Sequence, residues 1–326
     1  MFCDTILKDC FLEIVMNRRL KGNLFLFTAA LFWGSTFVAQ EIAAKTYHLG
    51  AFTYQSTRML VGSFVLVPLI LFMNKFSKAN GTYKKPTKKE NKTLIFAGLV
   101  CGVVLCVAAC LQQFAIEDPA TNSGKIAFIT AMYILIVPII YFFFGNKISL
   151  RVIVAALMGA VGLYFLSVKG GQGFSSVTYG DVLAMLCAVG FSAHILVVDY
   201  FAPKVDGVKL SSIQFFVCGI LALIPTILIE KPEISQILEC WGPILYAGVF
   251  SCGIAYTFQI LGQQNSSPTI ASILMSLESV FGVLTGIIIL KNIPTVRETI
   301  GCVIMFTAII ISQLNLTNKD EQKRVE

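Results

Sequence analysis

Ten long apolar runs restrict what this chain can fold into more than any other feature. A helix needs about 20 mostly apolar residues to cross the hydrocarbon core of a bilayer. The short connections between the runs favour antiparallel neighbours, so we predict an all-α integral membrane protein of ten transmembrane helices. The runs are Leu24–Ile42, Phe52–Met73, Leu94–Phe114, Ala120–Phe144, Val152–Val168, Asp181–Phe201, Ser211–Ile229, Trp241–Leu261, Thr269–Leu290 and Thr299–Leu314.

The composition agrees with a lipid environment. The chain is 56% hydrophobic and 13% charged, whereas soluble proteins are about 45–50% apolar and about 25% charged. The net charge of +7 does not indicate nucleic-acid binding, because the basic residues lie in short tracts between apolar runs. The ten cysteines contain no CxxC pair, so we predict no metal site, and we expect no cofactor.

The distribution of positive charge predicts the orientation. Ten crossings place both termini on one side, and that side carries eighteen Lys and Arg residues against five on the other. Such an excess marks the cytoplasmic side, so we predict a multi-pass protein of the plasma membrane with both termini in the cytoplasm. Residues 1–15 are too polar for a signal-peptide core. We interpret them as an unstructured tail or as the product of a start codon upstream of the natural one.

The two halves of the chain resemble each other. Lys125–Ile148 aligns without a gap with Ile270–Ile293, which places Tyr133 opposite Glu278. Pro68 and Pro225 also lie at corresponding points of their runs. We therefore predict a duplicated chain with an N-terminal tail at 1–20, a first five-helix repeat at 21–168, a second at 169–315 and a C-terminal tail at 316–326.

An odd number of crossings in each half has a topological consequence. The second half must enter the membrane upside down relative to the first, which makes the two halves inverted repeats. Secondary transporters commonly use this arrangement, with a substrate site near the midplane between the repeats.

Six motifs stand out along the chain: Ala30–Phe37, Gln55–Arg58, Gly124–Ala131, Val137-Pro138, Gly180–Ala184 and Ser276–Phe281. They resemble those of one transporter family, the EamA-type branch of the drug/metabolite transporter superfamily. The resemblance covers Lys21 to about Asn315 and implies a ten-helix bundle that moves small metabolites across the plasma membrane, often outward. The family often has Pro where Ser279 stands, and an acidic residue where Lys291-Asn292 stands.

Polar and aromatic side chains within the apolar runs are the candidate binding residues. A charge at the middle of a membrane helix costs a few kcal/mol, which a partner or a water-filled cavity must offset. Glu278 lies near the middle of its run, and helical spacing places Met275 on the same face. The predicted substrate-binding residues are Trp33, Gln55, Arg58, Lys125, Tyr133, His194, Tyr256, Gln259 and Glu278.

Five of these side chains also have an ordinary structural interpretation. Arg58 can pair with Glu278, with Glu41 or with an anionic group of the substrate, or it can reach the outer interface. The same interface is within reach of Lys125 and of the neighbouring pair Gln112-Gln113. Glu278 can be a structural carboxyl held between helices, and the lone His194 and Trp33 can be packing residues.

These observations favour a secondary transporter that works by alternating access. Charges of both signs within the runs suit an amino acid or a similar small metabolite, and we expect transport to be outward. The partners are then the substrate and the lipid bilayer; the sequence does not indicate an oligomeric state. No GxxxxGK[ST] motif for ATP hydrolysis occurs. The alternatives are a transporter-like channel or a non-transporting assembly protein, and less favourably an intramembrane enzyme, for which no HExxH motif occurs.

Overall fold

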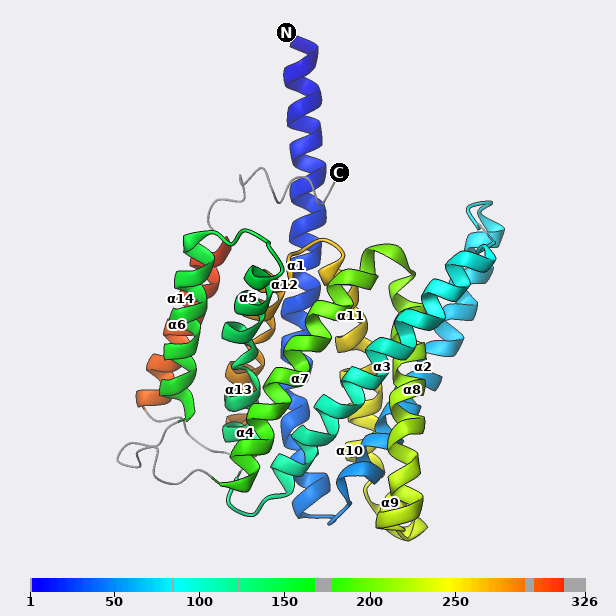
Figure 1. Ribbon diagram of the computed structural model, residues 1–326, viewed down its shortest axis with the longest axis vertical. Coiled ribbons are helices and arrows are strands. Elements are labelled where there is room, and N and C mark those ends of the chain that lie inside the picture. Colours follow the sequence, from blue (N-terminus) through cyan, green and yellow to red (C-terminus); the bar gives the residue numbers. More distant parts are fainter. Residues whose placement is uncertain (1, 84, 122, 168–177, 291–295, 314–326) are drawn as a thin grey trace.

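The protein is a bundle of helices in the computed structural model (Figure 1). The structure describes residues 2–83, 85–121, 123–167, 178–290 and 296–313, and these ranges contain no strand. The first half comprises α1 (Phe2–Lys45), α2 (Ala51–Ala79), α3 (Lys88–Glu117), α4 (Ser123–Thr130), α5 (Tyr133–Phe143) and α6 (Leu150–Ser167). Residues 2–20, predicted as a tail, are the first turns of α1.

The second half has more interruptions in its helices. Two of these are π-helical segments, and one of them follows Pro225 directly. The elements are α7 (Tyr179–Phe201), the 3₁₀ turn η2 (Ala202–Lys204), α8 (Gly207–Pro225), η3 (Thr226–Glu230), α9 (Ile234–Glu239), α10 (Trp241–Tyr246), η4 (Ala247–Tyr256), α11 (Thr257–Gln263), α12 (Pro268–Met275), α13 (Glu278–Leu290) and α14 (Val296–Gln313).

Among the described residues, eight helical stretches are long and apolar enough to cross a bilayer. The other two predicted spans correspond to α6 and α14, whose apolar stretches Leu150–Gly162 and Thr299–Ala308 are shorter. The eight are Arg18–Lys45, Ala51–Ala79, Lys88–Glu117, Ser123–Phe143, Tyr179–Lys204, Gly207–Glu230, Trp241–Gln263 and Pro268–Thr285.

Two of these stretches are broken in the middle, at corresponding points. The break between α4 and α5 falls at Ala131-Met132, and the break between α12 and α13 falls at Ser276-Leu277. At both breaks, backbone hydrogen bonds join residues three positions apart, as in a 3₁₀ turn. Examples are the bonds from Ile134 N to Ala131 O and from Leu277 N to Leu274 O. The Ser276 hydroxyl also donates to a carbonyl of its own helix, a bond that bends helices.

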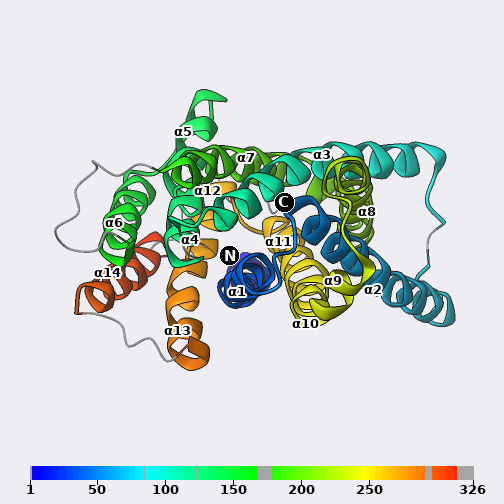
Figure 2. The same ribbon diagram turned by 90° about the horizontal axis from the view of Figure 1, so that it is seen from below.

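α1 lies between the two groups of helices when the molecule is seen along its length (Figure 2). It packs most extensively against α13. Gly34 of α1 shows how closely the two helices approach each other. A Cβ at Gly34 would lie 2.6 Å from the Glu278 carbonyl oxygen and 2.7 Å from the Gly282 nitrogen. The backbones of α1 and α13 are therefore in contact, and the start of α13 is pressed into the centre of the bundle.

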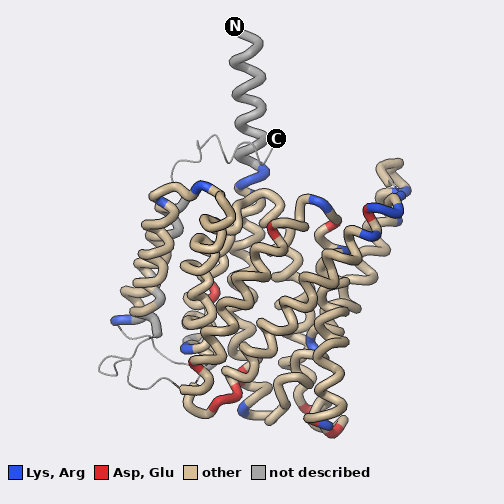
Figure 3. The backbone as a smooth tube through the Cα atoms, viewed as in Figure 1, with Lys and Arg blue, Asp and Glu red and all other residues tan. Residues whose placement is uncertain are grey.

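The remaining helices pack in pairs. α2 packs on α8, α3 packs on both α7 and α8, and α6 packs chiefly on α14, at one edge of the bundle (Figure 1). Figure 3 shows most charged residues at the two ends of the bundle and few between them. We call the end from which α1 projects the N-terminal face, and the opposite end the far face.

Candidate functional site

A small central pocket lies at the level of the two helix breaks. Its volume is about 30 Å³, which is room for about one or two water molecules. Six of the nine predicted binding residues line it: Trp33, Arg58, Tyr133, Tyr256, Gln259 and Glu278. The structure thus brings together residues from α1, α2, α5, η4, α11 and α13, which are far apart in the sequence.

Glu278 occupies the first position of α13, directly after the second helix break. Its side chain is 4% exposed, and its Oε1 accepts a hydrogen bond of 2.9 Å from the Tyr133 hydroxyl. Tyr133 is the first residue of α5, directly after the other break, and lies 145 positions earlier in the chain. The two residues that the internal alignment places opposite each other are therefore in contact at the pocket wall.

Arg58 enters the pocket from α2 and is 2% exposed. Its Nε donates to Gln55 Oε1 at 2.9 Å, and its guanidinium lies 5.4 Å from the centre of the Tyr54 ring. Its Nη2 is buried and has no hydrogen-bond partner among the described residues. A buried cation without an anion is costly, so this nitrogen is available to an anionic group in the pocket.

Gln55 supports Arg58 rather than the pocket itself. It is fully buried one helical turn before Arg58, and its Nε2 lies 3.9 Å from Cys218 Sγ of α8. The amide oxygen thereby faces the guanidinium. Because the two side chains follow each other at a spacing of three residues, this arrangement is local to α2 and visible in the sequence.

Aromatic rings form another wall of the pocket. Trp33 and Tyr256 meet edge to face, with ring centres 4.7 Å apart. The Trp33 indole nitrogen and Gln259 Oε1 are buried and have no partner among the described residues. The pocket therefore offers free donors at Arg58 and Trp33 and a free acceptor at Gln259, beside the carboxylate of Glu278.

Two predicted binding residues lie away from the pocket. His194 is packed behind Tyr256, with the two ring centres 6.0 Å apart, and its Nε2 is 3.1 Å from Gln214 Oε1. Lys125 lies near the far face, where its Nζ donates to Asp181 Oδ2 at 2.7 Å. Neither side chain lines the central pocket.

The remaining pocket residues differ in how well the sequence predicted them. Met275 was expected on the face of Glu278 and lines the pocket. The expectation that Gln112 and Gln113 reach an interface was wrong, because both are buried and Gln112 lines the pocket. Gln40 Nε2 donates to Gln112 Oε1 at 3.1 Å, so a polar side chain of α1 draws them inward. Thr36, Phe37 and Thr130 also line the pocket and lie within the motifs Ala30–Phe37 and Gly124–Ala131, whereas the lining residues without a signal are Phe191, Ile195 and Ser251.

The far face is closed by carboxylates that cap helix N-termini. Glu230 of η3 accepts from the backbone nitrogens of Phe52 and Thr53, at 2.8 and 2.7 Å, where α2 begins. Glu41 of α1 accepts from Ser123 N at 3.0 Å, where α4 begins. Free backbone N–H groups and the helix dipole make these positions favourable for negative charge. Each cap therefore links two helices at this face.

A third cap joins the two halves. Asp118, which follows α3, accepts from Gly180 N of α7 at 2.6 Å and from Ala120 N at 2.9 Å. The backbone N–H groups of Ala120 and Gly180 stabilise the charged form and lower the pKa of this carboxyl below its ordinary value of 3.8. The charge of Asp118 is thus tied to the closed arrangement of α3 and α7.

Comparison with known proteins agrees with this architecture. The sequence pattern of the EamA-like transporter family matches residues 20–168 and again residues 178–314. An uncharacterised transporter of Archaeoglobus fulgidus is 26% identical over 303 residues, which cover 92% of this chain and 88% of that protein. One of Methanothermobacter thermautotrophicus is 24% identical over 315 residues, covering 91% and 88%. A crystal structure of a protein of unstated function superimposes with a TM-score of 0.71 at 21% identity, covering 91% of this chain and 97% of its own.

Proposed function

The chain belongs to the EamA-like transporter family, and on this basis we propose that it is a secondary transporter. It moves an amino acid or a similar small metabolite outward across the plasma membrane by alternating access. The central pocket carries this proposal, because a basic side chain, Arg58, and an acidic one, Glu278, are buried there without an ion-pair partner among the described residues. A zwitterion supplies both missing charges.

The pocket suggests how such a substrate is held. The carboxylate of the substrate accepts from Arg58 and from the Trp33 indole nitrogen, whose donors are free. Its ammonium group donates to Glu278 and to Gln259. The rings of Trp33 and Tyr256 contact the remainder of the substrate. Because the pocket has a volume of only about 30 Å³, substrate entry requires the surrounding helices to separate.

We further propose that the chain crosses the membrane ten times, as two inverted halves at 21–168 and 169–315. In this arrangement α6 and α14 are the fifth and tenth spans. The matching helix breaks and the contact between Tyr133 and Glu278, 145 positions apart, support a duplication whose copies meet at the pocket. The excess of positive charge supports placing the N-terminal face in the cytoplasm.

A binding screen followed by transport measurements tests the function. Purified protein is heated with each member of an amino-acid panel, and a substrate is expected to raise the melting temperature. Proteoliposomes loaded with that compound are expected to show saturable exchange. Transport that rises without saturation would instead indicate a channel, and no transport of any panel member would reject the amino-acid class.

Variants then test the pocket. Glu278→Gln and Arg58→Gln are each expected to reduce exchange at least about tenfold, because each leaves one charge of the substrate without its partner. Arg151→Gln removes an exposed positive charge outside the pocket and is the matched control. If both pocket variants retain their melting temperature and transport like the parent protein, the proposed site is wrong.

A further inference from the structure

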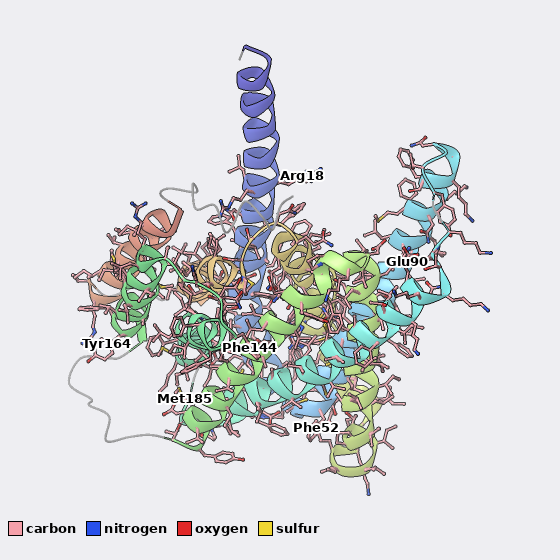
Figure 4. The ribbon with its side chains drawn as sticks, turned by 45° about the horizontal axis from the view of Figure 1, so that its top comes forward. Arg18, Phe52, Glu90, Phe144, Tyr164 and Met185 are labelled. Atoms are coloured by element: carbon pink, nitrogen blue, oxygen red, sulfur yellow. The ribbon has the colours of Figure 1, made fainter. Side chains whose placement is uncertain are left out.

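A second and much larger cavity lies near the N-terminal face. Its volume is about 800 Å³, compared with about 30 Å³ for the central pocket. α5 and α7 form its two long walls, through residues such as Ile140, Phe144, Leu196 and Val197. Figure 4 turns this face forward and labels Phe144, which directly follows α5. The proposed substrate site does not account for this space.

The position of α5 explains why the cavity exists. Pro138 removes one hydrogen bond from the middle of this helix, and Figure 2 shows α5 standing out beyond the line of α7. Phe142 and Phe143 are 62% and 81% exposed, so this end of α5 is not packed against the bundle. The gap between α5 and α7 therefore widens toward the N-terminal face.

The cavity and the central pocket share their walls. On α7, Ile195 lines the pocket and Leu196 lines the cavity. On α11, Gln259 lines the pocket, and Gln263, one helical turn later, lines the cavity. The two spaces therefore follow each other along the same pair of helices, with the cavity on the side of the N-terminal face.

Gln263 lies at the boundary between the two spaces. Its side chain is 2% exposed, and its Nε2 donates to the Ile195 carbonyl at 2.8 Å. Its Oε1 is buried and has no partner among the described residues. A buried amide oxygen without a partner is destabilising, and a water molecule or a hydrogen-bond donor of a solute in the cavity offsets this cost.

The outer part of the cavity carries positive charge. Arg19 of α1 and Lys204 of η2 line it, together with one acidic residue, Asp199. The Lys204 ammonium also lies over the ring of Tyr200. Apolar walls of low dielectric concentrate the field of such charges. The entrance therefore favours anionic groups.

We propose that this cavity is a water-filled cytoplasmic vestibule that collects solutes carrying an anionic group and delivers them to the central pocket past Gln263. This inference rests on the proposed transport function, and it adds that the route begins in the cytoplasm. Its occupants are water and solute. A lipid tail in the same space is the competing possibility, which the following experiment separates.

Charged thiol reagents test the vestibule without a known substrate. Leu196→Cys places a thiol in the cavity. Val189→Cys places one on nearly the same face of α7, two turns away, where the side chain is 51% exposed but outside the cavity. Inside-out vesicles are treated with an anionic (sulfonatoethyl) or a cationic (trimethylammonioethyl) methanethiosulfonate. Modification is counted by tandem mass spectrometry from fragment ions that separate the introduced thiol from Cys187, which lies in the same tryptic peptide, so the native cysteines do not interfere.

The vestibule predicts modification of Leu196→Cys at least about tenfold faster than of Val189→Cys, since only the first thiol meets water. After correction for intrinsic reactivity, the anionic reagent should react faster. Adding Lys204→Gln should reduce that preference roughly threefold. Lys209→Gln, at the same end of the bundle but outside the cavity, should leave it unchanged.

Three results would overturn the inference. Modification of Leu196→Cys only by membrane-permeant N-ethylmaleimide would mean that lipid fills the cavity. Modification only in right-side-out vesicles would place the cavity on the wrong side of the membrane. Absence of any charge preference would remove the selection of anionic groups. Normal labelling without transport of any panel member would reject the proposed amino-acid class of substrate and leave the water-filled cavity in place.

Discussion

The two ends of the bundle differ in how they use charged side chains. At the far face, Glu230, Glu41 and Asp118 accept hydrogen bonds from the first backbone N–H groups of α2, α4 and α7. Near the N-terminal face, Arg19 and Lys204 line a cavity of about 800 Å³. Carboxylates close one end because helix N-termini attract negative charge, whereas the other end offers a space large enough for a solute.

This difference indicates which contacts must break before the pocket can open to the far side. The pocket lies at the two helix breaks and is lined by Tyr133 of one half and Glu278 of the other. A movement of either half would therefore change the shape of the pocket. In the proposed alternating-access cycle, the far-face caps oppose that movement. Substitutions at these caps and at the contact between the two breaks test whether the far face is closed in this way.

The largest effect is expected for Glu230→Ala. It leaves Phe52 N and Thr53 N without an acceptor in a partly buried position, and we expect a loss of about 3 kcal/mol in unfolding free energy. Thermal unfolding of the purified protein measures it. Glu239→Ala removes an exposed carboxyl of the same connection and should have little effect. Equal losses from the two changes would contradict the capping role of Glu230.

Tyr133→Phe should have the next largest effect. It removes the hydroxyl that donates to Glu278, and a buried acceptor left without its donor costs about 2 kcal/mol. The melting temperature should fall for this variant and stay unchanged for Tyr179→Phe, whose ring is 74% exposed. A melting temperature equal to that of the parent protein would show that the contact between the two breaks does not stabilise this arrangement.

Two ion pairs compare the two faces directly. Lys125 and Asp181 are 2.7 Å apart at the far face, whereas Lys209 and Asp206 are 3.5 Å apart at the N-terminal face. Double-mutant cycles with Lys→Met and Asp→Asn should give about 1 kcal/mol for the first pair, which is the less exposed, and about 0.2 kcal/mol or less for the second. The reverse ranking would refute the closed far face.

The smallest effect depends on pH. Because its pKa is lowered in the folded state, Asp118 stabilises the protein above its unfolded pKa, and this contribution disappears as the pH falls through the lower folded pKa. Asp118→Asn should therefore reduce the melting temperature at pH 7 and make little difference in acid below the folded pKa. A difference that persists unchanged at low pH would show that the charge of Asp118 is not what joins α3 to α7.

The residues of the candidate site were predictable where a charged side chain lies within an apolar run. Arg58 and Glu278 are charges within apolar runs, and both line the pocket. The alignment of the two halves also placed Tyr133 opposite Glu278, and the two are bonded. Lys125 and His194 are also polar side chains within apolar runs, but they lie outside the pocket. There Lys125 is hydrogen-bonded to Asp181 and His194 to Gln214. Polarity within a span predicts that a partner exists and does not predict which.

The sequence by itself determined that this chain is helical and resides in a membrane, because only hydrogen-bonded backbone survives in hydrocarbon. Its motifs also placed it in its family. The tertiary structure decided which polar groups meet at the pocket, which carboxylates close the far face, and that α5 stands away from α7 to leave a cavity. Those outcomes depend on contacts between helices, such as that of Gly34 with α13. The neighbouring helices, rather than a helix's own residues, determine which of its faces is turned toward the pocket.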